Sequence, residues 1–80
     1  MKKGRRHLNR SMLEQIAREH PVISSKYDLK EYGADYLKRK VNGQIIEYVA
    51  IQGINSRIVP SVISLYRQGK DKRYYFEEII

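Results

Sequence analysis

The dipeptide Asn42-Gly43 constrains the fold of this chain more than any other feature of its sequence. Both residue types tolerate the positive φ angles of a two-residue type I′ turn, and such a turn fixes the register of the strands that flank it. The predicted hairpin joins residues 34–41 to residues 44–52. Its register places three pairs of residues opposite one another: Tyr36 and Val49, Leu37 and Tyr48, and Lys38 and Glu47. The opposite charges of the last pair support this register.

Two further strands are predicted beyond the hairpin, over residues 57–66 and 72–79. The first of them is rich in Val and Ile, and turn residues occupy the segments 53–56 and 68–71. Pro60 has no amide hydrogen to donate, so it marks a sheet edge or a bulge near the start of the third strand. The second half of the chain is therefore predicted to form a four-stranded antiparallel meander.

An amphipathic helix is predicted over residues 7–20. Five apolar side chains recur at helical spacing and would form one buried stripe: Leu8, Met12, Leu13, Ile16 and Ala17. Ser11 and Glu14 match a capping box that would start the helix later, but the earlier start keeps Leu8 in the stripe. Pro21 ends the helix, because the residue before a proline is driven out of the helical region.

These elements give an α+β fold in which an N-terminal helix packs on a four-stranded antiparallel β-meander. The 80 residues form one domain, with a basic arm at residues 1–6, the helix at 7–20 and the sheet at 34–79. Residues 22–33 are irregular, with a short helical turn around Leu29 as one alternative. Both faces of the first hairpin mix apolar and charged side chains, so the face that packs against the helix is left open.

The charge of the chain favours a polyanionic partner. Sixteen Lys and Arg against nine Asp and Glu give a net charge of +7 and a pI near 9.8. A net charge of +7 on so small a protein creates a positive potential that attracts polyanions. Seven tyrosines among the basic residues offer surfaces on which nucleobases can stack. A general solubilising charge is the alternative. The chain has no cysteine, which excludes disulfides and thiolate metal sites. No apolar stretch approaches the length of a membrane span, so we expect no membrane partner.

The spacing of the residues excludes most catalytic chemistries. The carboxylates are scattered, His7 and His20 lack a metal-ligand spacing, and there is no glycine-rich phosphate loop or nucleophile elbow. We therefore expect no metal and no cofactor. Cleavage of RNA needs neither, because RNA carries its own nucleophile, the 2′-hydroxyl. The protein then supplies a group that takes the proton of this hydroxyl, cations for the negative charge that builds on the phosphorane, and a donor to the leaving oxygen.

The order of the motifs resembles a known family. His7-x-x-Arg10 on the helix is followed by the run Tyr36–Lys40, an apolar strand at Glu47–Ile51 and the strand Ile58–Tyr66. This layout is similar to the small bacterial ribonuclease toxins of the barnase, EndoU, colicin and RelE-like fold. The resemblance implies a metal-independent endoribonuclease that acts on tRNA or mRNA in the cytoplasm and is held inactive by an acidic antitoxin or immunity protein. A toxin delivered from another cell fits the same layout. The catalytic residues that the resemblance implies are His7, Arg10, Arg39 and Ser64.

A non-catalytic nucleic-acid-binding module, of phage or plasmid type, is the second hypothesis, and a structural or protein-interaction domain is the third. Whether the chain is an enzyme stays open between them. In the first two hypotheses the arm and the strands contact the backbone of RNA, or alternatively of DNA. The residues predicted to make these contacts are Lys2, Lys3, Arg5, Arg6, Tyr36, Lys38, Lys40, Tyr66 and Arg67.

Some of these residues also have a purely structural interpretation. Ser64 lies among apolar strand residues, so packing explains it as well as function does. Lys38 has an acidic residue opposite it with which to pair, and His20 precedes the proline that ends the helix. Tyr74 and Tyr75 are adjacent on a predicted strand, so one is expected to pack and the other to be open.

Overall fold

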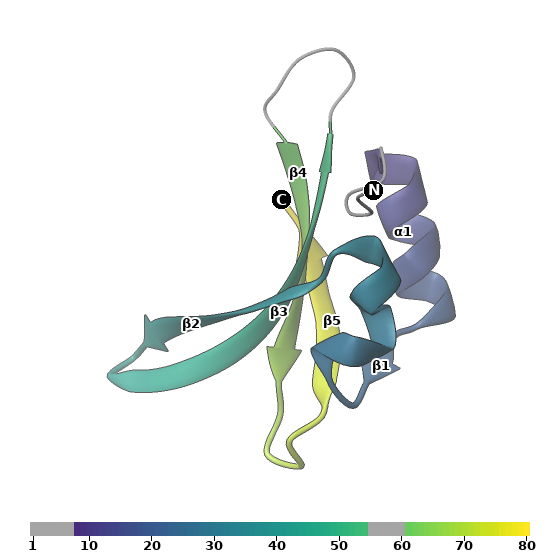
Figure 1. Ribbon diagram of the computed structural model, residues 1–80. Helices are drawn as coiled ribbons and strands as arrows, with labels where there is room; N and C mark the ends of the chain where they lie inside the picture. The colour runs from purple at the N-terminus through teal and green to yellow at the C-terminus, as the bar shows by residue number, and fades with distance from the viewer. Residues whose placement is uncertain (1–7, 55–60) are drawn as a thin grey trace.

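The computed structural model describes residues 8–54 and 61–80 (Figure 1). Within these ranges one α-helix and one short 3₁₀ segment accompany a five-stranded antiparallel sheet of order β1-β5-β4-β3-β2. The elements are α1 (Arg10–Glu19), β1 (Val22–Ile23), η1 (Lys26–Tyr32), β2 (Asp35–Val41), β3 (Gln44–Ile54), β4 (Ser61–Gln68) and β5 (Tyr74–Ile79). The predicted α+β class is confirmed, whereas the predicted number of strands, four, is wrong.

The additional strand is β1, which lies beside β5 at the edge of the sheet. The carbonyl of Pro21, just before it, accepts a hydrogen bond from the amide of Phe76 at 3.0 Å. Two residues are too few to show the alternation from which a strand is predicted, so residues 22–33 give no strand signal in the sequence. The pairs that β1 forms are Val22 with Tyr75 and Ile23 with Tyr74.

The helix α1 begins at Arg10, later than predicted. Asn9 is its N-cap, and the Asn9 side chain accepts a hydrogen bond from the backbone amide three residues on at 2.9 Å. Leu8 is buried but precedes the helix, and it shares the core with Leu13 as in a hydrophobic staple. The apolar spacing of Leu8 therefore reflects its burial and not a helical backbone.

The short segment η1 contains the helical turn that was one alternative around Leu29. Ser25 caps it through a reciprocal capping box with Asp28, and Gly33 ends it in the left-handed region at φ 80°. The fully buried Leu29 anchors this segment in the main core. η1 thereby links the helix to the first edge of the meander.

The hairpin predicted from Asn42-Gly43 is confirmed. The two residues have φ angles of 52° and 81°, as a type I′ turn requires, and β2 pairs with β3 in the predicted register. The third predicted strand is observed as β4, and its predicted first part, residues 57–60, lies outside the described residues. The fourth is observed as β5.

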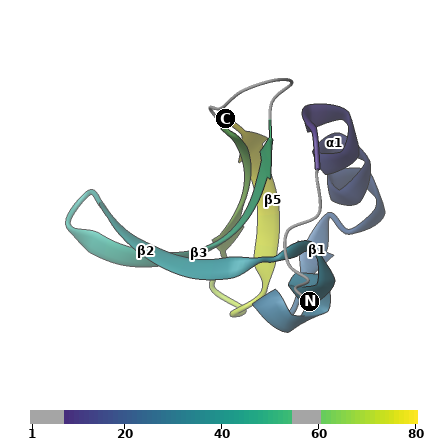
Figure 2. The same cartoon turned by 45° about the horizontal axis from the view of Figure 1, so that its top comes forward.

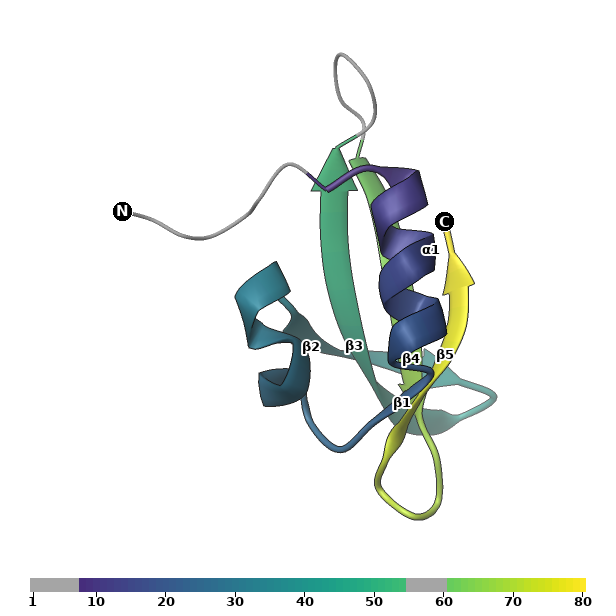
Figure 3. The same cartoon turned by 90° about the vertical axis from the view of Figure 1, so that its right-hand side faces the viewer.

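The helix covers one face of the sheet, as Figure 3 shows from the helix side. Alternate residues of β3 point to it, among them Val49 and Ile51, while Tyr48 and Ala50 point away. This settles which face packs against the helix. The buried residues of the main core are Leu8, Leu13, Ile16, Ile23, Leu29, Ala34, Val49, Ile51, Val62, Tyr66 and Tyr74.

The sheet is bent, with α1 on its convex side (Figure 2). The β2–β3 hairpin extends beyond the helix and curves away from it, so the opposite face is concave. On this concave face Tyr48, Ala50 and Leu65 are buried even though no described helix covers them. The fold thus leaves one concave face without a helical layer in the described part of the chain.

A register shift between β4 and β5 sets which side chains of β5 enter the core. Tyr66 pairs with Phe76, whereas its neighbour Leu65 pairs with Glu78, so Glu77 is an extra residue in β5. Phe76 and Ile79 consequently both pack against the main core.

Candidate nucleic-acid interface

The concave face carries two arginines on opposite sides of one tyrosine. Arg39 on β2 lies with its Cζ atom 5.5 Å from the centroid of the Tyr48 ring. Arg67 on β4 is paired directly opposite Tyr48, on the other side of β3. Because β2 and β4 both flank β3, the two arginine positions are roughly 10 Å apart across the sheet.

Neither arginine is neutralised. Within residues 8–54 and 61–80, no carboxylate lies within the 4.0 Å of an ion pair from Arg39 or Arg67. The cation–π contact with Tyr48 contributes about 0.5–2 kcal/mol and holds the Arg39 guanidinium in place without cancelling its charge. Two positive charges therefore remain available to an anion on this face.

The floor between and beside the arginines is apolar. Three partly buried side chains surround the buried residues of the concave face: Leu37, Ile46 and Ile63. Such a surface suits a flat, weakly polar group such as a nucleobase, while the guanidinium groups suit a phosphate.

Acidic residues also border this face, because Glu78 on β5 is paired opposite Leu65 and Asp35 on β2 is paired opposite Ala50. Asp35 on β2 forms an ion pair with Lys26 at 3.7 Å. Asp71, in the turn before β5, accepts a hydrogen bond from the Tyr75 hydroxyl, which lowers the pKa of the Asp71 carboxyl and raises that of the Tyr75 phenol. In the described residues, none of these carboxylates lies within ion-pair distance of Arg39 or Arg67.

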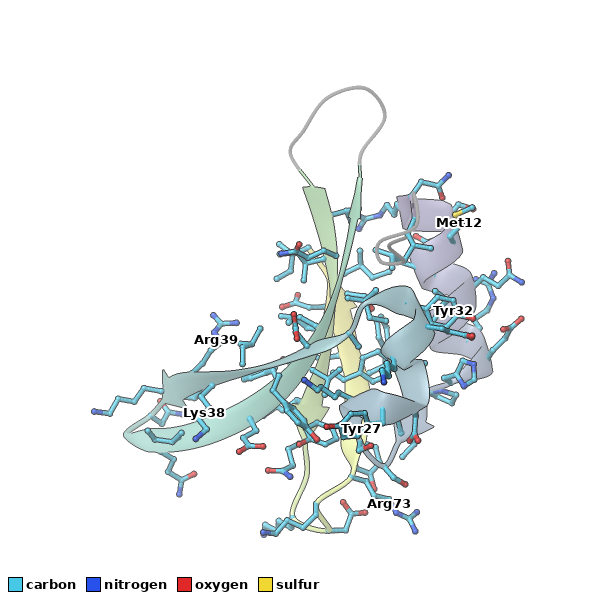
Figure 4. The ribbon with its side chains drawn as sticks, viewed as in Figure 1. Met12, Tyr27, Tyr32, Lys38, Arg39 and Arg73 are labelled. Atoms are coloured by element: carbon cyan, nitrogen blue, oxygen red, sulfur yellow. The ribbon has the colours of Figure 1, made fainter. Side chains whose placement is uncertain are left out.

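The hairpin displays cations on both of its sides. Arg39 projects from the concave side, and its neighbour Lys38 lies on the opposite side (Figure 4). Lys40 shares the side of Lys38, because successive residues of a strand alternate. All three side chains are exposed.

A row of polar side chains crosses the other, helix-facing side of the sheet beyond the region that α1 covers. In this row Lys38 is paired opposite Glu47, and Gln68 is paired opposite Tyr74. The Tyr74 hydroxyl donates to Glu47 Oε1 at 3.1 Å, and Gln68 Nε2 donates to the Tyr74 hydroxyl at 3.5 Å. Burial, together with hydrogen bonds to Tyr36 and Glu47, raises the pKa of the Tyr74 phenol.

The predicted pairing of Lys38 with Glu47 is confirmed as a register but not as an ion pair. The two residues face each other across the hairpin. Within the part of the chain that the structure describes, however, their charged groups are farther apart than the 4.0 Å of an ion pair. The hydroxyl of Tyr74 takes the place of the ammonium group on the carboxylate.

The four residues predicted as catalytic do not come together in the described structure. His7 lies outside the described residues. Arg10 forms an ion pair with Glu14 at 3.6 Å and donates a hydrogen bond to the carbonyl of Ile79 at 3.3 Å. Ser64 is 1% exposed on the helix-facing side, whereas Arg39 is on the concave side. A single substrate atom cannot touch both Ser64 and Arg39 in this arrangement.

Tyr66, predicted to bind nucleic acid, is also beneath the helix. Its side chain is fully buried, and its hydroxyl donates to the carbonyl of His20, the C-cap of α1, at 2.8 Å. Burial raises the pKa of this phenol to about 12. A correction follows for Tyr66 and Ser64 alike: alternation places both of them on the packed face of β4, out of reach of a ligand on the open face.

The remaining predicted contacts divide between the two faces. Arg67 lies on the concave face, while Tyr36, Lys38 and Lys40 lie on the other side of the hairpin. The four cations of the predicted arm, Lys2, Lys3, Arg5 and Arg6, lie outside the described residues. Of the 16 basic residues, 11 lie in the described ranges with all nine acidic ones, which leaves a net charge of +2 there.

The sequence predicted the different burial of the two adjacent tyrosines but not the hydrogen bond that one of them, Tyr74, donates to Glu47. The adjacent tyrosines were expected to divide between packing and exposure, and they do: Tyr74 is 3% exposed and Tyr75 is 41% exposed. The contact of Tyr74 with Glu47 had no signal, because it joins two strands that are not neighbours in the sheet. The contact of Arg39 with Tyr48 could have been found, since the register places Tyr48 diagonally across from Arg39.

Comparison with protein-family models, with curated proteins and with solved structures gives no significant match in any of the three searches. In the described residues, no helix has the length and apolar character to span a membrane.

Proposed function

We propose that this protein binds RNA through the concave face of its sheet. The observation that carries the proposal is the pair Arg39 and Arg67, which flank Tyr48 without a carboxylate partner in the described residues. Guanidinium groups bind phosphate oxygens in a two-pronged geometry, and the apolar floor between them accepts a base. RNA agrees with the sequence-based prediction, and DNA is the alternative ligand.

A single strand fits this face better than a duplex. Affinity for a flexible strand comes from cations that follow its backbone and from surfaces on which its bases stack. The concave face offers both within three adjacent strands, β2, β3 and β4. A ligand held in this way loses affinity as salt rises, because phosphate contacts release counterions.

The experiment is a fluorescence-anisotropy titration of a short single-stranded RNA at several KCl concentrations. We expect the double variant Arg39→Gln/Arg67→Gln to bind at least about tenfold more weakly, and its salt slope to fall by about 1.4, which corresponds to two lost contacts with a single strand. The matched control is Arg18→Gln/Arg73→Gln, which removes the same charge from exposed positions outside the concave face. Its affinity should change less than threefold.

Equal losses in the two double variants would show that net charge alone attracts the RNA, and the concave face would then not be the site. The same titration with DNA of the same sequence separates the two nucleic acids. An acidic antitoxin or immunity protein, as the resemblance implies, would compete with RNA for the same arginines. Cleavage of the bound RNA is a further step, because it needs an acid–base group as well as a binding surface.

A further inference from the structure

The geometry points to Glu47 as the general base of an RNA-cleaving centre on the helix-facing side of the β2–β3 hairpin, with Lys38 as its cationic partner and Tyr74 as the residue that positions it. This inference rests on the proposed RNA binding and adds to it a reaction and the residues that perform it. Nothing in the sequence pattern singled out Glu47 or Tyr74 for this role.

The carboxylate of Glu47 is fixed by one hydrogen bond and is not neutralised by an ion pair in the described residues. Its Oε1 atom accepts the hydroxyl of Tyr74 at 3.1 Å, and no other hydrogen bond or ion pair to Glu47 occurs in the described residues. The Glu47 side chain is half-buried, whereas Tyr74 is 3% exposed. A buried donor therefore fixes one carboxylate oxygen, and the other stays free to take a proton.

The positioning residue Tyr74 is itself held from two sides. Gln68 Nε2 donates to its hydroxyl at 3.5 Å and to the carbonyl of Lys72 at 3.4 Å. The rings of Tyr74 and Tyr36 lie 5.8 Å apart between their centroids. The hydroxyl that meets Glu47 is therefore fixed by groups from three strands and a turn, which is the support a catalytic carboxylate requires.

One cation, Lys38, faces this carboxylate without forming an ion pair with it. Lys38 faces Glu47 across the hairpin and is exposed. Lys26, whose Nζ atom lies 5.1 Å from the centroid of the Tyr36 ring, forms an ion pair with Asp35, so Lys38 is the cation that the centre uses. A phosphodiester next to Glu47 would thus lie beside positive charge, as stabilisation of a phosphorane requires.

The centre can be reached from the concave face. β2 is the last strand in the sheet order, and Arg39 and Lys38 project from its two sides. An RNA strand that is bound at Arg39 and passes over the free edge of β2 meets Lys38 and then Glu47. The layer crossed is about 10 Å thick, the spacing of one sheet with its side chains.

The reaction is transesterification within the RNA. Glu47 takes the proton of a 2′-hydroxyl, the 2′-oxygen forms a bond to the adjacent phosphorus, and the bond from phosphorus to the 5′-oxygen breaks. The leaving oxygen takes a proton from the Lys38 ammonium group. The products are a 2′,3′-cyclic phosphate and a 5′-hydroxyl, and water exchanges the proton from Glu47 back to Lys38. Neither an oxidant nor a further reactant is needed.

The test uses the full chain, a labelled single-stranded RNA and buffer with EDTA, and it measures cleavage rate and affinity separately. We expect Glu47→Gln to cut at least about 100-fold more slowly, in the range that general bases contribute, with a Kd within threefold of the parent. Lys38→Gln, which changes an exposed side chain and leaves the packing intact, should slow cutting at least about tenfold. Glu31→Gln, an exposed carboxylate on η1, is the matched control and should cut at the parent rate.

Two readouts separate catalysis from a structural role. Tyr74→Phe should slow cleavage, but the double variant Glu47→Gln/Tyr74→Phe should be no slower than Glu47→Gln alone, because the hydroxyl acts through the carboxylate. RNA with 2′-deoxy sugars should bind and resist cutting. A parent protein that binds RNA and leaves it intact would overturn the inference and leave the proposed function standing, and so would undiminished cutting by both Glu47→Gln and Lys38→Gln. A parent protein that does not bind RNA would overturn both proposals.

Discussion

The hydroxyl of Tyr66 donates a hydrogen bond to the backbone carbonyl of His20 at 2.8 Å and so ties the middle of β4 to the C-terminal end of α1. The two residues are 46 positions apart in the chain. This bond satisfies a phenol that is fully buried and one of the carbonyl groups that a helix leaves without a partner at its end.

Removal of this hydroxyl should destabilise the fold without changing the affinity of the protein for RNA. Tyr66→Phe keeps the ring in the core and leaves the His20 carbonyl without its side-chain donor, so we expect a loss of about 1–2 kcal/mol in the free energy of unfolding. Urea unfolding followed by circular dichroism measures the loss. Weaker RNA binding by a variant of normal stability would contradict the buried, structural role of Tyr66.

The same phenol should make the protein sensitive to alkali. Its pKa is raised from 10.0 to about 12 by burial, so the folded state favours the protonated form. The resulting stabilisation is complete below pH 10 and is lost as the pH rises from 10 through 12, by at most about 3 kcal/mol for two pKa units. Stability should therefore fall more steeply over this interval in the parent than in Tyr66→Phe, since Tyr74 titrates in both proteins. Urea midpoints at pH 8, 10, 11 and 12 would detect the difference, and parallel profiles would show that Tyr66 does not titrate in the folded state.

Ser64 should tolerate loss of its hydroxyl. Its Oγ atom is buried and has no hydrogen-bond partner in the described structure, and an unsatisfied polar group in that position costs free energy. Ser64→Ala should therefore be as stable as the parent or more stable by up to about 1 kcal/mol, and it should cleave RNA at the parent rate. Thermal unfolding and the cleavage assay check the two halves. Loss of cutting at unchanged stability would restore Ser64 to the catalytic set.

Gly53 should resist substitution for a steric reason. A Cβ atom at this position would lie 2.6 Å from the carbonyl oxygen of Leu8 and 3.3 Å from Cδ1 of Leu13. Gly53→Ala should therefore lose about 2–3 kcal/mol, the cost of an overpacked core. Gly43→Ala is the comparison, because position 43 is open but has φ 81°, so only backbone strain of about 1 kcal/mol is expected there. The order of the two losses in denaturant unfolding decides the point, and equal stabilities would refute the close contact.

Local chemistry accounts for what the sequence could predict. The hairpin and its register follow from Asn42-Gly43, because a two-residue turn leaves one pairing only. The helix follows from its apolar spacing, although its first turn does not, since the buried Leu8 precedes the helix. The strand β1 is too short for any pattern, and its pairing with β5 depends on residues more than 50 positions away.

The candidate site was less predictable because its parts are joined by the sheet and not by the chain. Whether Ser64 and Tyr66 face a ligand or the helix depends on which side of the sheet α1 covers, and the mixed pattern of the hairpin does not reveal this side. The hydrogen bond from Tyr74 to Glu47 passes across the intervening β4. No spacing rule within one strand anticipates such a contact.

The extra residue in β5, Glu77, determines on which side of the sheet the Glu78 carboxylate lies. With strict alternation, Phe76 in the core would be followed by Glu78 in the core, directly under α1. Glu77 advances the phase by one position, so that Ile79 enters beneath the helix and Glu78 turns outward opposite Leu65. Deletion of Glu77 would therefore remove the bulge but leave Glu78 opposite Leu65 and Ile79 opposite Ser64 in a regular ladder, so the interior would keep its aliphatic side chain; a shift of the ladder that paired Glu77 would instead turn the Glu78 carboxylate inward.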